Sequence, residues 1–206
     1  MTQRTILIAD DEPHTAHALA ELVESAGYRV VGKATTGEET VLLNETLSPD
    51  VVILDILLSG EIDGLQAADI MMKTRPVPVV VCTARYDDRS LDCASRIGAY
   101  AYITKPCRSM DLLPAINLAI ERFEESKTLK EEVRNLKQAL EDRKIVEQAK
   151  GIVMHTYQMT ECEAHRFLQH ESQRQRKSLP ELAQSILLAD KTPSDTTRNP
   201  PPENIT

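Results

Sequence analysis

The sequence is poor in aromatic residues, which make up only 3% of its 206 residues and include no tryptophan. Proteins that bind single-stranded nucleic acid stack its bases on aromatic side chains. The composition therefore argues against such a stacking platform. Hydrophobic residues still amount to 41% of the chain, which is enough for one sizeable core or two small ones.

Long apolar segments are also missing. No stretch approaches the roughly 18 consecutive apolar residues of a membrane span, and no apolar segment follows a basic N-terminus as in a secretory signal. We therefore expect no membrane association and a cytoplasmic location. The five histidines form no HExxH pattern, so we expect no structural zinc.

Cysteines are few and lack CxxC spacing. The four are Cys82, Cys93, Cys107 and Cys162. Their spacing predicts free thiols in a reducing compartment. The net charge of −8 lies in residues 1–127, while the remainder is close to neutral. The acidic front half is a poor nucleic-acid binder, and charge alone does not decide the role of the back half.

Five apolar or β-rich segments alternate with helical patterns in the first part of the chain. The predicted strands are 5–9, 28–34, 51–55, 77–83 and 99–104, and the predicted helices begin at Pro13, Gly37, near Leu65, at 87 and near Pro114. At least three strands have no polar face, which is typical of a parallel sheet covered on both sides. We therefore predict an α/β domain over residues 1–122 with a doubly wound five-stranded parallel sheet.

A long helical segment follows this domain. Residues 115–150 contain no glycine or proline, and Leu129, Val133, Leu136 and Leu140 step by four, three and four positions. This is the a/d spacing of a two-stranded coiled coil. We predict a coiled-coil linker over 123–145 that dimerises through these four residues. A long amphipathic helix packed on its own domain is the alternative.

Two capping boxes mark further helices. Thr160 with Glu163, and Ser178 with Glu181, match the S/T-x-x-E pattern and predict helices over 161–174 and 179–189. Together with the end of the long helix they would give three helices in this part of the chain. The tail, 191–206, is rich in proline and small polar residues, and we predict that it is disordered.

Residues with complementary chemistry follow the predicted strands. Asp10 and Asp11 follow the first strand, Asp55 the third, Thr83 the fourth and Lys105 the fifth. Ligands of such sheets bind beyond the carboxyl ends of the strands. Crowded carboxylates raise one another's pKa values, and a divalent cation such as Mg²⁺ relieves that penalty.

Carboxylate, Mg²⁺ and lysine together suit one reaction. Asp55 would attack a phosphoryl group to give an acyl phosphate, and the metal and Lys105 would neutralise the transferring oxygens. The Thr83 hydroxyl would donate a hydrogen bond to a phosphoryl oxygen once the group is attached to Asp55. A single aspartate at a strand end is usually a turn or helix cap, but the combination of all four strand ends favours the functional interpretation.

Residues 1–122 resemble the CheY-like receiver domain of bacterial two-component response regulators. The residues that carry the resemblance are Asp10, Asp11, Asp55, Thr83, Ala84, Tyr102, Lys105 and Pro106. The resemblance implies that a sensor histidine kinase phosphorylates Asp55 and that Asp10, Asp11, Asp55 and the backbone carbonyl of Leu57 hold Mg²⁺. It also implies that Thr83 and Tyr102 report the phosphate to the face of the fourth helix, fifth strand and fifth helix, and that a cis peptide precedes Pro106.

One segment departs from the receiver pattern. In many receivers a Met-Pro pair follows soon after the phosphorylated aspartate, whereas this chain has DILLSGEIDG from Asp55 to Gly64 and one extra residue before that glycine. The departure puts the shape of this loop in question and leaves the chemistry of the site unaffected.

The segment from Ala139 to Met154 is the second informative stretch. Gly151 costs about 1 kcal/mol against alanine inside a helix, and it permits close approach of another backbone, although packing between helices is an alternative. With the two helices that follow it, this segment resembles an ANTAR domain over residues 135–190, with matches at Ala139, Leu140, Arg143, Glu147, Ala149, Lys150 and Gly151. The resemblance implies a small three-helix all-α domain. The resemblance implies binding to paired RNA hairpins, suppression of transcription termination, and a homodimer favoured by phosphorylation.

The candidate RNA-binding residues are Arg143, Gln148, Ala149, Lys150, Gly151, Arg174 and Arg176. For the last two, a favourable interaction with the helix dipole is an equally plain explanation. A DNA-binding regulator would need a recognition helix with exposed polar residues, whereas 179–190 is mostly apolar or acidic. An output that only dimerises is the other alternative. After residue 122 we find no nucleophile–base pair, metal cluster or phosphate loop, so we expect no enzymatic output: the chain would take up phosphate from a kinase and slowly lose it.

Overall fold

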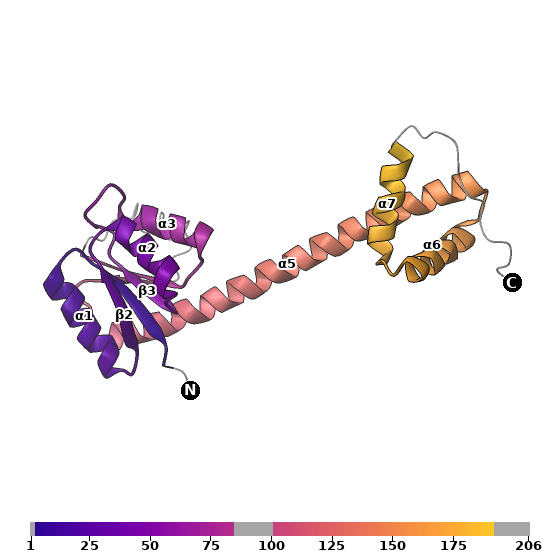
Figure 1. Ribbon diagram of the computed structural model, residues 1–206. Coiled ribbons are helices and arrows are strands. Elements are labelled where there is room, and N and C mark those ends of the chain that lie inside the picture. Colours follow the sequence, from indigo (N-terminus) through magenta and orange to yellow (C-terminus); the bar gives the residue numbers. More distant parts are fainter. Residues whose placement is uncertain (1–2, 85–100, 192–206) are drawn as a thin grey trace. The chain divides into compact units, whose positions relative to one another are not determined.

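A five-stranded parallel sheet forms the centre of the first part of the chain (Figure 1). The computed structural model describes residues 3–84 and 101–191. The strands are β1 (Thr5–Ala9), β2 (Arg29–Ala34), β3 (Val51–Leu54), β4 (Val79–Thr83) and β5 (Ala101–Thr104). Their order in the sheet is β2-β1-β3-β4-β5, and every neighbouring pair is parallel. The predicted α/β sheet is therefore confirmed.

Helices cover both faces of this sheet, as its two apolar faces require. One face packs against α1 (Pro13–Ser25) and the first turns of α5 (Ser109–Tyr157). The other face is covered by α2 (Gly37–Leu47) and α3 (Gly64–Thr74), and β3 between the two layers is buried along its whole length. The helix predicted over 87–97 lies outside the described residues.

Local capping sets where several helices begin. Pro13 stands at the first position of α1, where its missing N–H is no loss. At α2 the Thr36 side chain accepts from the Glu39 N–H, and at α3 Asp63 and Gln66 form a reciprocal capping box. The starts of these helices at the carboxyl edge of the sheet are therefore fixed by local interactions.

Helix α5 begins earlier than the sequence predicted. It starts at Ser109, so that Pro114 lies inside the helix and not near its first residue. A proline in a helix removes one backbone hydrogen bond. Leu112 and Ile116 on either side of it are fully buried against the sheet, and this packing outweighs the local preference. The helix continues through Gly151 to Tyr157.

The second compact unit begins at Leu129. It contains the end of α5 together with α6 (Glu161–Gln175) and α7 (Leu179–Lys191), and both predicted capping boxes are present. Its small core is formed by Val153, Ala164, Leu168 and Leu182. Residues 192–206 lie outside the described residues. In the described ranges, no helix has the length and apolar character needed to cross a bilayer.

Candidate functional site

The register of the sheet brings the first and third strand ends together. Ala9 is paired with Leu54, and the Asp55 N–H donates to the Ala9 carbonyl at 2.8 Å. Because the two strands are parallel neighbours, Asp10 and Asp55 leave the sheet side by side at its carboxyl edge. The predicted proximity of these two aspartates is what the structure shows.

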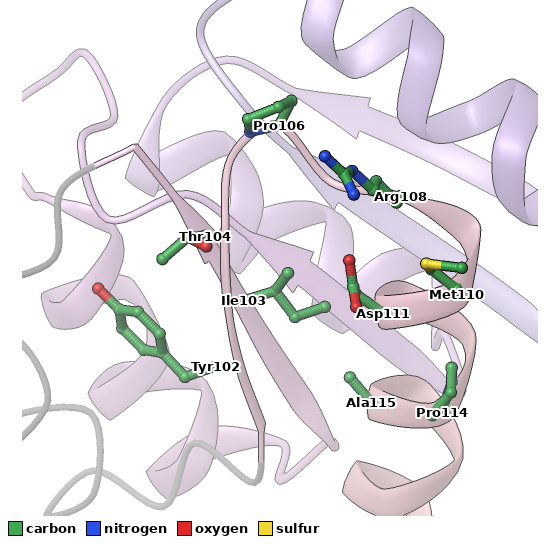
Figure 2. A pocket seen from close by; sticks show the side chains of 9 residues that line it. All are labelled: Tyr102, Ile103, Thr104, Pro106, Arg108, Met110, Asp111, Pro114 and Ala115. Atoms are coloured by element: carbon green, nitrogen blue, oxygen red, sulfur yellow. The ribbon is translucent and has the colours of Figure 1, made fainter.

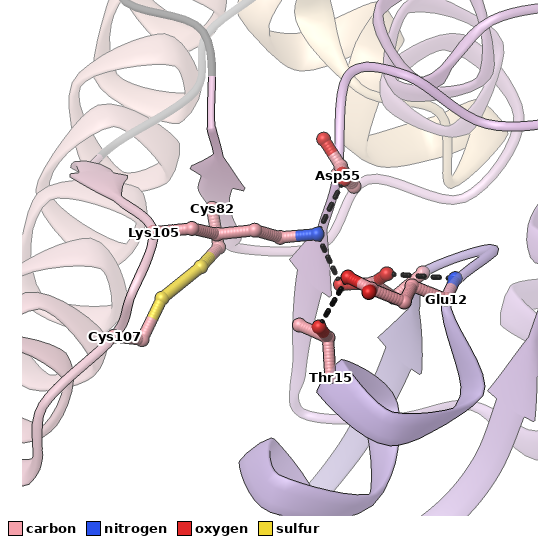
Figure 3. Close-up of a disulfide and its surroundings, with 7 residues drawn as sticks. Glu12, Thr15, Asp55, Cys82, Lys105 and Cys107 are labelled. Atoms are coloured by element: carbon pink, nitrogen blue, oxygen red, sulfur yellow. Dashed lines mark hydrogen bonds and ion pairs between the residues drawn. A yellow bond between two sulfur atoms is a disulfide. The ribbon is translucent and has the colours of Figure 1, made fainter.

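Lys105 contacts both aspartates, and Figure 3 shows its side chain reaching Asp55. Its Nζ lies 2.6 Å from Asp10 Oδ2 and 2.5 Å from Asp55 Oδ2. Only 1% of Asp10 and 6% of Asp55 are exposed, so these charges interact with little screening by water. The peptide between Lys105 and Pro106 is cis.

Burial and pairing act in opposite directions on the charges of the site. Burial raises the pKa of Asp10 above its ordinary value, although Lys105 opposes this shift. For Lys105, burial acts to lower the pKa, but the hydrogen bonds and charges of Asp10 and Asp55 outweigh it and the pKa is raised. Lys105 is therefore a permanent cation at neutral pH.

The acidic residues fit a divalent cation. Carboxylate oxygens of Asp10, Asp11 and Asp55 all lie within 4.8 Å of one another. Buried Asp10 Oδ2 has no hydrogen-bond donor of good geometry in the described part of the chain and is met only by the Lys105 ammonium. Three carboxylates and one ammonium leave two negative charges, and an all-oxygen donor set of this kind suits Mg²⁺.

The remaining predicted switch residues lie around the same edge. Thr83 is fully buried at the end of β4, and its carbonyl accepts from the Lys105 N–H at 2.9 Å. Ala84 is exposed directly after it, and Tyr102 on β5 is half-buried. The roles of Thr83, Ala84 and Tyr102 toward a phosphoryl group stay predictions. The carboxyl ends of β1, β3, β4 and β5 do lie at the same edge of the sheet.

A surface hollow of about 660 Å³ lies beside β5 and the start of α5 (Figure 2). It is lined by Tyr102, Ile103, Thr104, Pro106, Arg108, Met110, Asp111, Pro114 and Ala115. The predicted reporter Tyr102 belongs to this lining. The hollow therefore adjoins the segment that carries Lys105.

The loop after β3 supplies a residue that the sequence prediction missed. Ser59 Oγ donates to Asp11 Oδ2 at 2.9 Å. Asp11 is exposed, so this hydrogen bond restrains a carboxylate that would otherwise rotate freely. Ser59 occupies part of the segment where the Met-Pro pair of many receivers is absent, and the unusual loop thus holds one of the three candidate metal ligands.

Glu38 at the start of α2 holds this loop in place. Its Oε1 accepts from the N–H groups of Glu61 and Ile62, at 2.7 and 3.0 Å. Hydrogen bonds from its own backbone N–H and from these two residues hold the pKa of Glu38 below its ordinary value. Gly60 has φ of +116°, and a Cβ there would lie 2.4 Å from Glu38 Oε2. The positive φ of Gly60 is a backbone conformation that favours glycine over any residue with a side chain.

The candidate RNA-binding residues of the second unit fall into two groups. Arg143, Gln148 and Gly151 are exposed on α5, and Arg174 and Arg176 are exposed at the end of α6. Arg174 forms two hydrogen bonds with Glu171. Arg176 adopts a left-handed conformation that caps α6.

Ala149 and Lys150 are buried. Lys150 is 8% exposed, and its Nζ lies 2.7 Å from Glu147 and 2.8 Å from Glu161. The hydrogen bonds that the Lys150 ammonium donates to Glu147 and Glu161 raise the pKa of Lys150. These ion pairs connect α5 to the start of α6. An RNA contact by Lys150 stays a prediction, and it would have to replace one of these carboxylates.

The prediction of free thiols is wrong for two cysteines. Cys82 of β4 and Cys107, before α5, form a disulfide (Figure 3). Their 25-residue separation carries no local signal, and only the pairing of β4 with β5 brings the two segments together. Cys162 is free and exposed, and Cys93 lies outside the described residues.

Comparison with known proteins agrees with this geometry. Residues 6–117 match the response regulator receiver domain family. The receiver domain of a modulated diguanylate cyclase from Desulfovibrio desulfuricans G20 superposes with a TM-score of 0.57 at 30% identity, over 61% of this chain and 99% of that one. The chemotaxis protein CheY of Thermotoga maritima is 33% identical over 55% of this chain and 95% of its own length. Sheet and site together define a response-regulator receiver.

The second unit shows which kind of response regulator this chain is. Residues 134–187 match the ANTAR domain family. The transcriptional regulatory protein PdtaR of Mycobacterium tuberculosis is 39% identical over 193 residues, which is 94% of each chain. This chain therefore belongs to the response regulators that carry a receiver domain followed by an ANTAR output domain.

We predict that Ser59→Ala weakens Mg²⁺ binding about 3- to 10-fold, because Asp11 loses the hydroxyl that restrains it. Isothermal titration calorimetry of the unphosphorylated protein with Mg²⁺ measures the change.

The Mg²⁺ affinity of the wild-type protein should fall as pH is lowered, since the raised pKa of Asp10 lets protons compete with the cation. The same titration repeated at several pH values measures this effect.

Ser59→Thr is the matched control, because it keeps a hydroxyl at the same position and should bind Mg²⁺ nearly as the wild type does. Equal Mg²⁺ affinities for the alanine and threonine variants would show that the hydrogen bond to Asp11 does not position the ligand.

Proposed function

We propose that this chain is a phosphorylation-controlled RNA-binding regulator that prevents transcription termination. A sensor histidine kinase phosphorylates Asp55 in the cytoplasm, and the ANTAR domain binds RNA hairpins in target transcripts. The observation that supports this most strongly is the contact of Lys105 with both Asp10 and Asp55 at the carboxyl edge of the sheet. A nucleophile, a cation site and a fixed positive charge are thereby assembled in one place.

The residues of the site divide the chemistry between them. An Asp55 carboxylate oxygen attacks the phosphorus of the phosphohistidine, the new O–P bond forms, and the P–N bond breaks with its electron pair going to the imidazole nitrogen. Asp10, Asp11, Asp55 and the Leu57 carbonyl would hold Mg²⁺, which neutralises charge on the phosphoryl oxygens when bound. Lys105 neutralises charge on another phosphoryl oxygen, and the Thr83 hydroxyl donates a hydrogen bond to an oxygen of the attached phosphoryl group.

The RNA-binding part of the proposal is supported by Gly151. A Cβ placed on this residue would meet nothing within 4 Å, so packing within the described part of the chain does not require glycine there. A glycine that costs about 1 kcal/mol against alanine in an exposed position favours close approach by a partner backbone. Arg143 and Gln148 are also exposed on α5 and would contact phosphates and base edges.

DNA recognition is less well supported. A major-groove reader needs a helix with several exposed polar side chains, whereas α7 is mostly apolar or acidic and packs Leu182 and Ala183 into the core of the small domain. Binding of matched hairpin RNA and duplex DNA, with and without an acyl-phosphate donor, separates the alternatives. Preference for the duplex would favour a DNA-binding regulator, and binding to neither would favour an output that only dimerises.

Dimerisation is proposed to use the predicted a/d residues of α5. Leu129, Val133, Leu136 and Leu140 are between 42% and 71% exposed. Four large apolar side chains on one stripe of a helix favour pairing with a second copy, since burying each leucine contributes about 1.5–3 kcal/mol. Phosphorylation would favour the dimer and so present two ANTAR domains to paired hairpins.

Asp55→Asn should abolish phosphorylation, because an amide is not a nucleophile toward phosphorus. Acetyl phosphate with Mg²⁺ should add one phosphoryl mass to Asp55 of the wild type, located by peptide mass spectrometry. Asp50→Asn, an aspartate that bonds Thr5 away from the site, is the control and should be labelled normally. Labelling of the Asp55→Asn protein to the wild-type level would reject the assignment of the phosphoacceptor.

Leu136→Lys should weaken the phosphorylation-favoured dimer at least about tenfold, because it places charge on an apolar seam. Sedimentation with beryllofluoride and Mg²⁺ measures the dimer. Leu42→Lys is the control, since Leu42 is a leucine on α2 that is 59% exposed, against 71% for Leu136. If both variants dimerise alike, the seam is not the interface.

Gly151→Gln should lower hairpin-RNA affinity about tenfold while leaving the fold as stable or slightly more stable, because glutamine favours the helix and meets no neighbour. Gel-shift titration and thermal unfolding measure the two effects. Gln138→Ala, on the opposite side of α5, is the control. Unchanged RNA affinity in Gly151→Gln with a weakened dimer would assign the glycine to contact with a second copy.

A further inference from the structure

The disulfide between Cys82 and Cys107 lies directly beside the candidate phosphoacceptor site (Figure 3). Cys82 immediately precedes Thr83 at the end of β4, and Cys107 is two residues beyond Lys105. The Lys105 N–H also donates to the Thr83 carbonyl at 2.9 Å. The covalent bond therefore fastens the segment that carries the catalytic lysine to the strand that carries the phosphate-binding hydroxyl.

The two sulfurs differ in their access to solvent. Cys82 is 1% exposed and belongs to the main core, whereas Cys107 is half-buried at the rim of that core. A small-molecule oxidant or reductant can therefore approach Cys107, while Cys82 reacts only with its partner. A pair with one accessible and one protected sulfur is suited to reversible oxidation and is protected from random exchange.

We propose that Cys82 and Cys107 form a reversible redox site that controls phosphorylation of Asp55. The proposal rests on the proposed function of Asp55. In the cytoplasm, where thiols are held reduced, a disulfide is usually transient and redox-sensing. The pair would thus give the receiver a second input besides the kinase.

The oxidant would be a hydroperoxide. The Cys107 thiolate attacks a peroxide oxygen, the O–O bond breaks, and the leaving oxygen takes up a proton and departs as an alcohol or water, so that Cys107 becomes a sulfenic acid. The Cys82 thiol then attacks this sulfur, the S–O bond breaks, the disulfide forms, and the hydroxyl leaves as water with the thiol proton. In the reverse direction a dithiol attacks Cys107, Cys82 departs as a thiolate, and the second thiol of the reductant releases Cys107 as the reductant becomes a cyclic disulfide.

The effect on the site follows from the position of Lys105. In the oxidised form the bond confines residues 105–107 to β4, which keeps the ammonium on Asp10 and Asp55 in the geometry that acyl-phosphate formation needs. In the reduced form the segment is held only by non-covalent contacts, and a smaller fraction of molecules has Lys105 in place. Oxidation therefore accelerates phosphorylation.

The same segment borders the hollow beside β5 and α5. Pro106 and Arg108, on either side of Cys107, both contribute to its lining (Figure 2). Release of Cys107 from β4 frees these two residues to move. The redox state of the pair is therefore expected to reach the surface next to Tyr102 as well as the phosphoacceptor.

The identity of the site is tested on the full chain in a Cys93→Ser, Cys162→Ser background. The protein is reduced with dithiothreitol, treated with hydrogen peroxide, alkylated and mapped by mass spectrometry. The expected result is a Cys82–Cys107 cross-linked peptide that disappears on renewed reduction. Full alkylation of both cysteines after peroxide treatment would overturn the redox site.

The regulatory effect is tested by the rate of Asp55 labelling from acetyl phosphate and Mg²⁺ in the same background. The oxidised protein should be labelled about 3- to 10-fold faster than the reduced protein, and its Tm should be higher by roughly 5–15 °C. Cys107→Ser is the control and should show the slow rate under both conditions.

Equal labelling rates in the oxidised and reduced forms would reject redox control while leaving Asp55 as the phosphoacceptor. Labelling in neither form would reject the proposed function and, with it, the control of phosphorylation. The two failures are thus distinguished by the same experiment.

Discussion

The contact of Lys105 with Asp10 and Asp55 is the interaction on which the receiver site depends. Two buried carboxylates would repel each other at the end of adjacent strands, and breaking such a pair leaves an uncompensated buried charge. The ammonium relieves part of this cost. With the third carboxylate, Asp11, the site keeps two negative charges, and these define a place for a divalent cation. The parallel register of β1 and β3 makes the arrangement unavoidable, because it delivers both aspartates to one edge.

Residues outside the strand ends hold the loops around the receiver site in place. Ser59 donates a hydrogen bond to Asp11, Glu38 accepts from the backbone of the loop after β3, and the disulfide fixes the segment after β5. In the second unit, Lys150 with Glu147 and Glu161 has a comparable role, since it joins α5 to α6 through charge. Each unit therefore combines an apolar core with one lysine-centred ion-pair cluster at the region where function is proposed.

Much of the fold was predictable because local signals agree with the tertiary structure. Unbroken apolar strands predicted the covered parallel sheet, and the capping boxes at Thr160 and Ser178 placed α6 and α7 within two residues. The start of α5 was missed because the burial of Leu112 and Ile116 outweighs the local effect of Pro114. The disulfide and the bond from Ser59 to Asp11 join residues 25 and 48 positions apart, and only the assembled sheet brings such residues together.

The most direct test of the central claim is a crystal structure of the protein with Mg²⁺ and beryllofluoride. The account predicts a cation bound by Asp10, Asp11, Asp55 and the Leu57 carbonyl, beryllofluoride on an Asp55 oxygen, and Lys105 in contact with a fluorine. A cation bound elsewhere, or beryllofluoride absent from Asp55 at saturating concentration, would contradict the assignment of this edge of the sheet as the phosphoacceptor site.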